Sequence, residues 1–146
     1  MTENVIISIK GRQLFDEQEP DVMELVTAGT LEHNPEGGYT LSYQESELTG
    51  LEGTQTVFRI DGNRVTLTRE GEVNSMMIFE EGRRHLSMYE TPYGALSVGV
   101  NTRRMRAELD AAGGQIEIDY AIEVDHAVTG QNLFQIQVTK APKIKQ

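Results

Sequence analysis

Short segments in which apolar and polar residues alternate make up almost the whole chain, and turn-forming residues separate them. The clearest segment runs from Gln115 to Val124, where every second residue is Ile, Tyr or Val. Successive side chains of a β-strand point to opposite faces, so this segment has one apolar and one polar side. About ten such segments, with no convincing helix between them, predict an all-β fold in which an antiparallel sheet curls around one interior.

The chain length limits how these strands are organised. A chain of 146 residues fits one domain, which buries roughly two thirds of its unfolded surface, so we expect a single domain over residues 1–146. Short connections join neighbouring strands antiparallel, and closure removes the exposed edges of a twisted sheet. We predict a single antiparallel meander closed into a barrel of about eight to ten strands, wide enough inside for side chains or one small ligand.

Turn-forming residues indicate where individual strands end. Asp61-Gly62-Asn63 lies between two β-branched runs and predicts a hairpin, because these residues accept positive φ. Glu80-Glu81-Gly82-Arg83 predicts a second hairpin. Gly29 interrupts the alternation of Val22–His33 and predicts a bulge or a tight bend. The segment 103–112 is rich in helix-forming residues but also alternates like its neighbours, so we favour a strand there over a helix.

Composition narrows the classes of partner. The net charge of −10 argues against nucleic acid, whose binding requires neutralising phosphates. Acidic residues dominate the first half, including an expected solvated loop at residues 16–21, and residues 141–146 are expected to form a short basic tail. There is no cysteine for disulfides or thiolate metal sites. The first residues lack the basic region of a signal peptide, and no apolar run approaches ~18 residues, so we expect a cytoplasmic protein without a membrane partner.

Several runs of residues, taken in order, resemble a known family. They are Gly38-Tyr39-Thr40-Leu41-Ser42-Tyr43-Gln44-Glu45, Arg69-Glu70-Gly71, Phe79-Glu80-Glu81-Gly82, Tyr89-Glu90-Thr91-Pro92-Tyr93-Gly94, Thr102, and Gly113-Gly114-Gln115-Ile116-Glu117-Ile118-Asp119-Tyr120. Together they resemble the YwiB-like proteins over roughly residues 4–140. The resemblance implies a calycin-like (lipocalin-type) β-barrel in a cytoplasmic bacterial protein of unknown function. The chain has no tryptophan, so the Gly-x-Trp motif of secreted lipocalins is absent.

Arginines and tyrosines are the candidate ligand-binding residues. Arg69, Arg84 and Arg104 adjoin apolar alternation, so some are expected to point into the barrel, where a guanidinium needs a carboxylate or phosphate partner. Tyr43 and Tyr89 would line a pocket of mixed polarity. The alternative is that the arginines lie outside and pair with glutamates, and that the tyrosines fill the core with their hydroxyls at the rim.

Catalytic and metal-binding patterns are not evident. Ser97 lies within a predicted strand rather than at the strand-to-helix turn that exposes a nucleophilic serine. His33, His85 and His126 have no metal-ligand spacing, and we expect neither a metal nor a cofactor. The sequence therefore predicts a barrel that is not an enzyme.

Two hypotheses for function remain open. The favoured one is a small barrel that binds a small anionic or amphipathic molecule in its interior. The other is a protein–protein interaction module that acts through its outer surface, as a monomer or a homodimer. A third reading, an enzyme with a site at the barrel mouth, would require a strongly perturbed titrating group in a cleft.

Overall fold

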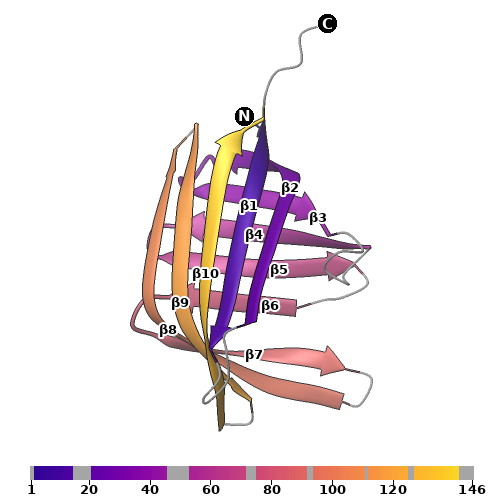
Figure 1. Cartoon of the computed structure of the whole chain (residues 1–146), viewed down its shortest axis with the longest axis vertical. Helices are drawn as coiled ribbons and strands as arrows, with labels where there is room; N and C mark the ends of the chain where they lie inside the picture. The colour runs from indigo at the N-terminus through magenta and orange to yellow at the C-terminus, as the bar shows by residue number, and fades with distance from the viewer. Residues whose placement is uncertain are drawn as a thin grey trace, which may run out of the picture.

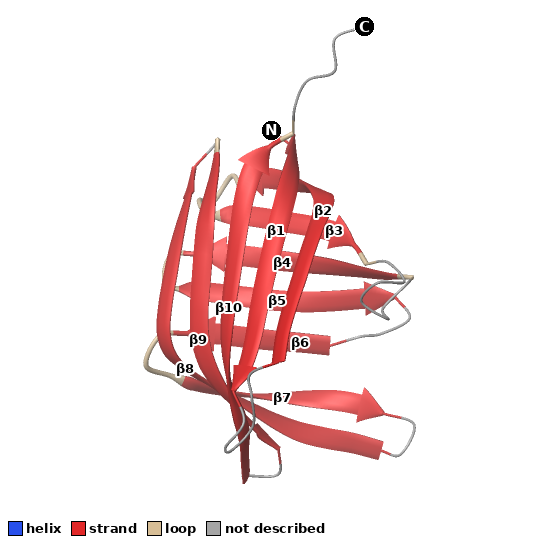
Figure 2. Ribbon diagram, in the orientation of Figure 1, coloured by secondary structure: helices blue, strands red, loops and turns tan. Residues whose placement is uncertain are grey.

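The computed structural model describes residues 2–14, 21–45, 53–71, 75–91, 94–110, 112–124 and 127–141, with the backbone alone at residues 14, 21, 88–91 and 127–129. These residues form ten strands and no helix, which confirms the all-β prediction (Figure 2). None of them forms an apolar helix of membrane-spanning length. The strands are β1 (Thr2–Leu14), β2 (Asp21–His33), β3 (Tyr39–Gln44), β4 (Thr54–Asp61), β5 (Arg64–Gly71), β6 (Ser75–Glu80), β7 (Arg84–Thr91), β8 (Gly94–Asp110), β9 (Gly113–Val124) and β10 (Ala127–Lys140).

The ten strands form one antiparallel sheet in the order β6-β5-β4-β3-β2-β1-β10-β9-β8-β7. In Figure 1, β1, β2, β9 and β10 stand side by side in front, and β3 to β6 cross behind them. The first half of β8 runs with β7 below, and its second half joins the front strands. The sheet thus wraps round on itself into a nearly closed barrel, at the upper end of the strand number that we predicted.

The barrel does not close where the sequence suggested a hairpin. A turn does follow Glu80, because the Arg83 N–H donates to the Glu80 carbonyl at 3.0 Å. However, β6 and β7 are the two ends of the sheet and share no ladder, so the hairpin prediction at residues 80–83 is wrong. The turn bonds to β8 instead, because the Thr102 N–H donates to the Arg83 carbonyl at 3.2 Å. By contrast, β4 and β5 form the predicted hairpin around Gly62.

The gap between β6 and β8 is bridged by the turn and by charged side chains. The Gly82 N–H donates to the Thr102 carbonyl at 2.9 Å, and the Met105 N–H donates to the Glu81 carboxylate at 3.1 Å. A group of charged side chains lies beside this turn: Glu80 and its basic neighbours Arg64, Arg83 and His85, which we call the seam cluster. The Glu80 carboxylate lies 3.2 Å from Arg64, 3.8 Å from Arg83 and 3.0 Å from His85 Nε2.

The second half of β8 confirms the strand that we favoured over a helix. A bulge between Thr102 and Arg104 shifts the register of β8 against β9. Beyond it, Met105, Ala107 and Leu109 pack against the core, while the residues between them are exposed. Packing on the interior therefore overrides the helix propensity of this segment.

Inward-facing apolar side chains from most of the strands fill the centre of the barrel. Phe79 and Tyr120 meet edge to face with ring centres 4.8 Å apart, as aromatic pairs prefer. The largest fully buried side chains are Phe58, Phe79, Ile7, Ile9, Leu41, Ile116, Ile118, Ile136, Val5, Val65 and Val100, together with Thr54.

Of the two features predicted at Gly29, a bulge or a tight bend, the structure excludes the bulge. The ladder between β1 and β2 passes through Val5 and Gly29 without a register shift, so there is no bulge. A Cβ at this position would overlap the Ser42 carbonyl oxygen and crowd the Ile7 side chain. Gly29 therefore allows β2 and β3 to come together at the turn of the sheet, beside Tyr43.

Candidate functional site

Polar side chains on the inner face of β3, β4 and β5 form the first part of the candidate site. Tyr43 lies opposite Thr56, and Thr56 lies opposite Arg69, so the three share one row across the sheet. We call these three residues the inner polar row. Tyr43 and Thr56 are buried, and Arg69 continues the inward alternation of Val65 and Leu67. A core that is otherwise apolar thus has one polar edge.

Glu45 lies next to this row and is only 7 % exposed. The Thr56 hydroxyl donates to its carboxylate at 2.6 Å, and the Tyr43 hydroxyl is also hydrogen-bonded to it. Burial and the negative charge of Glu45 raise the pKa of the Tyr43 phenol well above its usual value, and the charge of Arg69 opposes this only in part. Tyr43 is therefore a neutral hydrogen-bond donor at physiological pH.

Arg69 contributes a positive charge that the row leaves unmatched. Its side chain is half-buried, and its Nε is buried without a hydrogen-bond acceptor. None of the ion pairs among the described residues includes Arg69. A buried donor without an acceptor is costly, and an arginine fork fits a carboxylate or phosphate. An anion that entered the barrel would supply the missing acceptor.

An apolar cavity forms the second part of the candidate site. It has a volume of about 290 Å³ and lies against β1, β2, β9 and β10, with Gly11, Met23, Tyr120, Asn132 and Phe134 among its lining residues. Gly11 lines the wall without a side chain, which leaves room for the cavity. Its size is close to the lower end of the range of small-molecule pockets.

The inner polar row and the cavity are linked by one pair of aromatic rings. Phe58 lies two residues beyond Thr56 on the same face of β4, and its ring centre is 6.2 Å from that of Phe134. Phe134 in turn lines the cavity. The Phe58–Phe134 pair therefore lies between the inner polar row and the apolar cavity, inside the same barrel.

Two of the other predicted site residues, Arg84 and Arg104, do not join Tyr43 and Arg69. Arg84 donates through Nε to Glu123 at 2.6 Å, and both lie beside Gly99, away from the inner polar row. Arg104 is exposed on the outer face, where it lies opposite Asp119. Tyr89 lies opposite Leu96 in β7, but its side chain is outside the described residues. The acidic loop at 16–20, His126 and the tail at 142–146 are also outside them.

Sequence reasoning missed Thr56, Glu45 and the cavity as parts of the site. Thr54 and Thr56 continue the inward alternation of Phe58 and Ile60, so strand phase was the signal that could have placed Thr56 inside. No such signal marks the cavity, because its volume depends on how the side chains of four strands pack.

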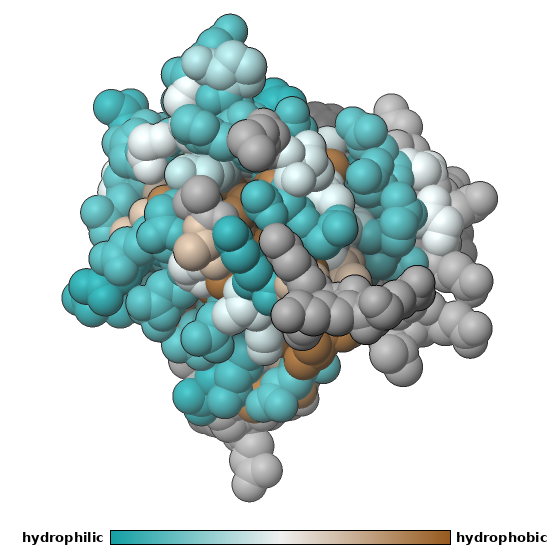
Figure 3. Space-filling view, turned by 90° about the horizontal axis from the view of Figure 1, so that it is seen from above, coloured by the Kyte–Doolittle hydropathy of each residue, from teal (hydrophilic) through white to brown (hydrophobic). Residues whose placement is uncertain are grey.

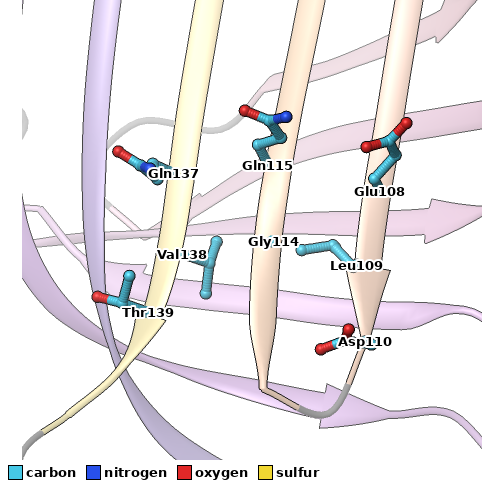
Figure 4. A pocket seen from close by; sticks show the side chains of 8 residues that line it. All are labelled: Glu108, Leu109, Asp110, Gly114, Gln115, Gln137, Val138 and Thr139. Carbon is cyan, nitrogen blue, oxygen red and sulfur yellow. The ribbon is translucent and has the colours of Figure 1, made fainter.

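Other surface features have weaker claims to be a site. A shallow hollow lies where Gly114 leaves a gap between Leu109 and Val138, and exposed polar side chains such as Gln115 and Gln137 surround it (Figure 4). Seen from above, the barrel is mainly hydrophilic, with apolar residues visible between polar ones (Figure 3). Within the described ranges, no three His, Asp or Glu side chains are grouped to hold a metal.

Comparisons with known proteins agree on one family. A family model described as a domain of unknown function, DUF1934, matches residues 7–136. The uncharacterized beta-barrel protein YwiB of Bacillus subtilis (strain 168) is 25 % identical over 109 residues, which cover 75 % of each chain. The crystal structure of that protein has a TM-score of 0.84 at 21 % identity and covers 97 % of this chain and 94 % of its own. The chain therefore belongs to the DUF1934 family of unknown function, as the resemblance to YwiB-like proteins predicted.

Proposed function

We propose that the barrel binds a small amphipathic anion, with the anionic group on Arg69 and the apolar part directed toward the cavity at Phe134. The observation that carries the proposal is the Nε of Arg69, which is buried inside the barrel without an acceptor. A charge in this position is stabilised by an opposite charge with hydrogen-bonding oxygens.

The apolar half of the site supports an amphipathic ligand over a simple inorganic anion. Met23, Leu133 and Phe134 contribute apolar lining to the cavity, and burying an alkyl chain there would gain about 0.8 kcal/mol for each CH₂ group. Asn132 and Gln13 provide polar groups at its border. We propose that the protein binds this ligand without catalysis and that it does so in the cytoplasm. We also propose that the ligand lies inside a calycin-like barrel.

The test is a calorimetric titration of the protein with octanoate, which combines one carboxylate with a short alkyl chain. We expect saturable binding that Arg69→Gln weakens by about tenfold or more, because one charge-assisted hydrogen-bonding group is lost. Arg104→Gln is the matched control, since that arginine is exposed on the outer face and should leave the affinity unchanged.

A second pair of variants tests the cavity. Gly11→Leu places a large side chain in the cavity and should abolish octanoate binding. Gly11→Ala is its control, because the added Cβ would lie at an ordinary contact distance of 3.8 Å from Met23 Cε. Failure of octanoate to bind the wild-type protein, or equal binding by all four variants, would refute the proposal.

The alternative function, self-association through the outer surface, is favoured by β2. Its pairing with β3 begins only at Thr30, so among the described strands nothing pairs with that edge over residues 22–28. Val22 and Val26 are 52 % and 68 % exposed on this strand. An unpaired apolar edge is suited to pairing with a second copy of the chain. Sedimentation should then show a dimer that Val26→Lys dissociates, and a monomer at all concentrations would exclude this function.

A further inference from the structure

The charges in and beside the inner polar row limit what kind of anion the barrel can hold. Arg69 is the single cation of the row, and Glu45 is the buried carboxylate next to it. No ion pair among the described residues joins these two, and the charges of both act on Tyr43. The sum of the two charges is zero before a ligand binds.

Glu45 is fixed where it is. Its carboxylate accepts the Thr56 hydroxyl at 2.6 Å and is hydrogen-bonded to the Tyr43 hydroxyl, so it cannot turn away without leaving two buried donors unsatisfied. At 7 % exposure it is largely shielded from water, and charges in such surroundings interact more strongly than charges at the surface. The charges of Glu45 and Arg69 both act on Tyr43, so a ligand on Arg69 lies within the electrostatic field of Glu45.

We infer that Glu45 is a specificity-determining residue that restricts the barrel to anions of a single charge, such as carboxylates, and rejects dianions such as phosphate monoesters. This inference rests on the proposed function. A monoanion pairs with Arg69 and leaves one net negative charge in the site, that of Glu45. A second negative charge on the ligand has no further cation in the inner polar row and is repelled by Glu45.

The experiment compares three ligands on the wild-type protein: octanoate, which has eight carbons in all, and octyl methyl phosphate and octyl phosphate, which share one octyl chain. At about pH 8 the first two carry one negative charge and the third carries nearly two. We expect the dissociation constants of both monoanions to be at least about tenfold lower than that of the dianion. One repulsive contact between charges at low effective dielectric weakens binding by about this factor. Glu45→Gln should raise the affinity for octyl phosphate and so reduce the discrimination, because glutamine still accepts the Thr56 hydrogen bond.

Each outcome decides one question. Equal affinity of the wild-type protein for octyl phosphate and octyl methyl phosphate overturns the role of Glu45 and leaves the proposed function intact. Discrimination that persists undiminished in a folded Glu45→Gln variant also overturns it. If that variant does not fold, the wild-type comparison of the two phosphates still decides. Absence of octanoate binding refutes the proposed function itself.

Discussion

Two polar groups of this barrel, the inner polar row with Glu45 and the seam cluster, contain similar side chains in opposite arrangements. In the seam cluster, the single carboxylate of Glu80 is surrounded by Arg64, Arg83 and His85. In the interior, the carboxylate of Glu45 accepts hydroxyl hydrogen bonds, while Arg69 Nε lacks an acceptor. The seam cluster joins the two end strands of the sheet, and its carboxylate has basic partners. The interior keeps one cation available, and this difference indicates which group is suited to bind a ligand.

The largest expected effect comes from removing the interior carboxylate. Glu45→Ala leaves the hydroxyls of Tyr43 and Thr56 buried without their acceptor, so we expect a loss of about 3 kcal/mol in the free energy of unfolding. Chemical denaturation measures this loss, and the control is Gln44→Ala, which changes the exposed last residue of β3 next to Glu45. A loss below about 1 kcal/mol would mean that Glu45 does not organise the interior as we describe.

Gly29→Ala should have the next largest effect. The new methyl group would overlap the Ser42 carbonyl and crowd Ile7 and Tyr43, which should cost about 2 kcal/mol by forcing the backbone apart. Thermal unfolding of this variant should be compared with that of Gly11→Ala, whose methyl group has room. Equal stability of the two variants would contradict the close approach of β2 and β3.

Arg69→Met separates binding from stability most sharply. Because this variant removes a half-buried charge whose Nε has no acceptor, we expect a change within about 1 kcal/mol, toward greater stability, while octanoate binding is lost. Arg104→Met on the outer face should alter neither quantity appreciably. Destabilisation by Arg69→Met that matches the loss caused by Glu45→Ala would show that Arg69 is structural, and the contrast with the seam cluster would then fail.

The seam cluster should make the free energy of unfolding depend on pH in the acid range. Hydrogen bonding to His85, and then the hydrogen bond and charge of Arg64, lower the pKa of Glu80 below 4.5, so in acid the unfolded chain binds more protons at this residue than the folded protein. The stabilisation from Glu80 is therefore present above pH 4.5 and is lost as the pH falls through the lower folded value. Glu80→Gln should flatten the acid side of the stability profile, measured by denaturation at several pH values. An unchanged profile would show that the cluster does not brace the seam.

Strand phase made much of the fold predictable from the sequence. Val65 and Leu67 set the inward phase of β5, and Arg69 follows it. The same rule misplaces Arg104, because Val98, Val100 and Thr102 are buried on one face until the bulge after Thr102 reverses the phase. The apolar residues that resume at Met105 are consistent with this reversal. However, residues 102–104, where the bulge lies, include no glycine or proline that would indicate it from the sequence.

Long-range pairing and packing were beyond the sequence. The turn at residues 80–83 has good hairpin chemistry, yet its backbone is hydrogen-bonded to Thr102 of β8, which is distant in the sequence, and local residues cannot specify that contact. The orientation of Arg84 depends on Glu123, which is distant in the sequence. The cavity depends on the absence of a side chain at Gly11 and on the packing of Phe134 against Phe58.

The pairing of β1 with β10 has a consequence for how the chain folds. Every other ladder joins strands that follow each other in sequence, so it can form as a local event. The β1–β10 ladder joins the two ends of the described chain, with Val5 opposite Lys140. If a linker joined those ends and the chain were cut at the turn 81–83, the order along the chain would be the order in the sheet, from β7 round to β6. Such a circular permutant would replace the slowest contact of the barrel with a local one, and its refolding should be faster than that of the natural chain.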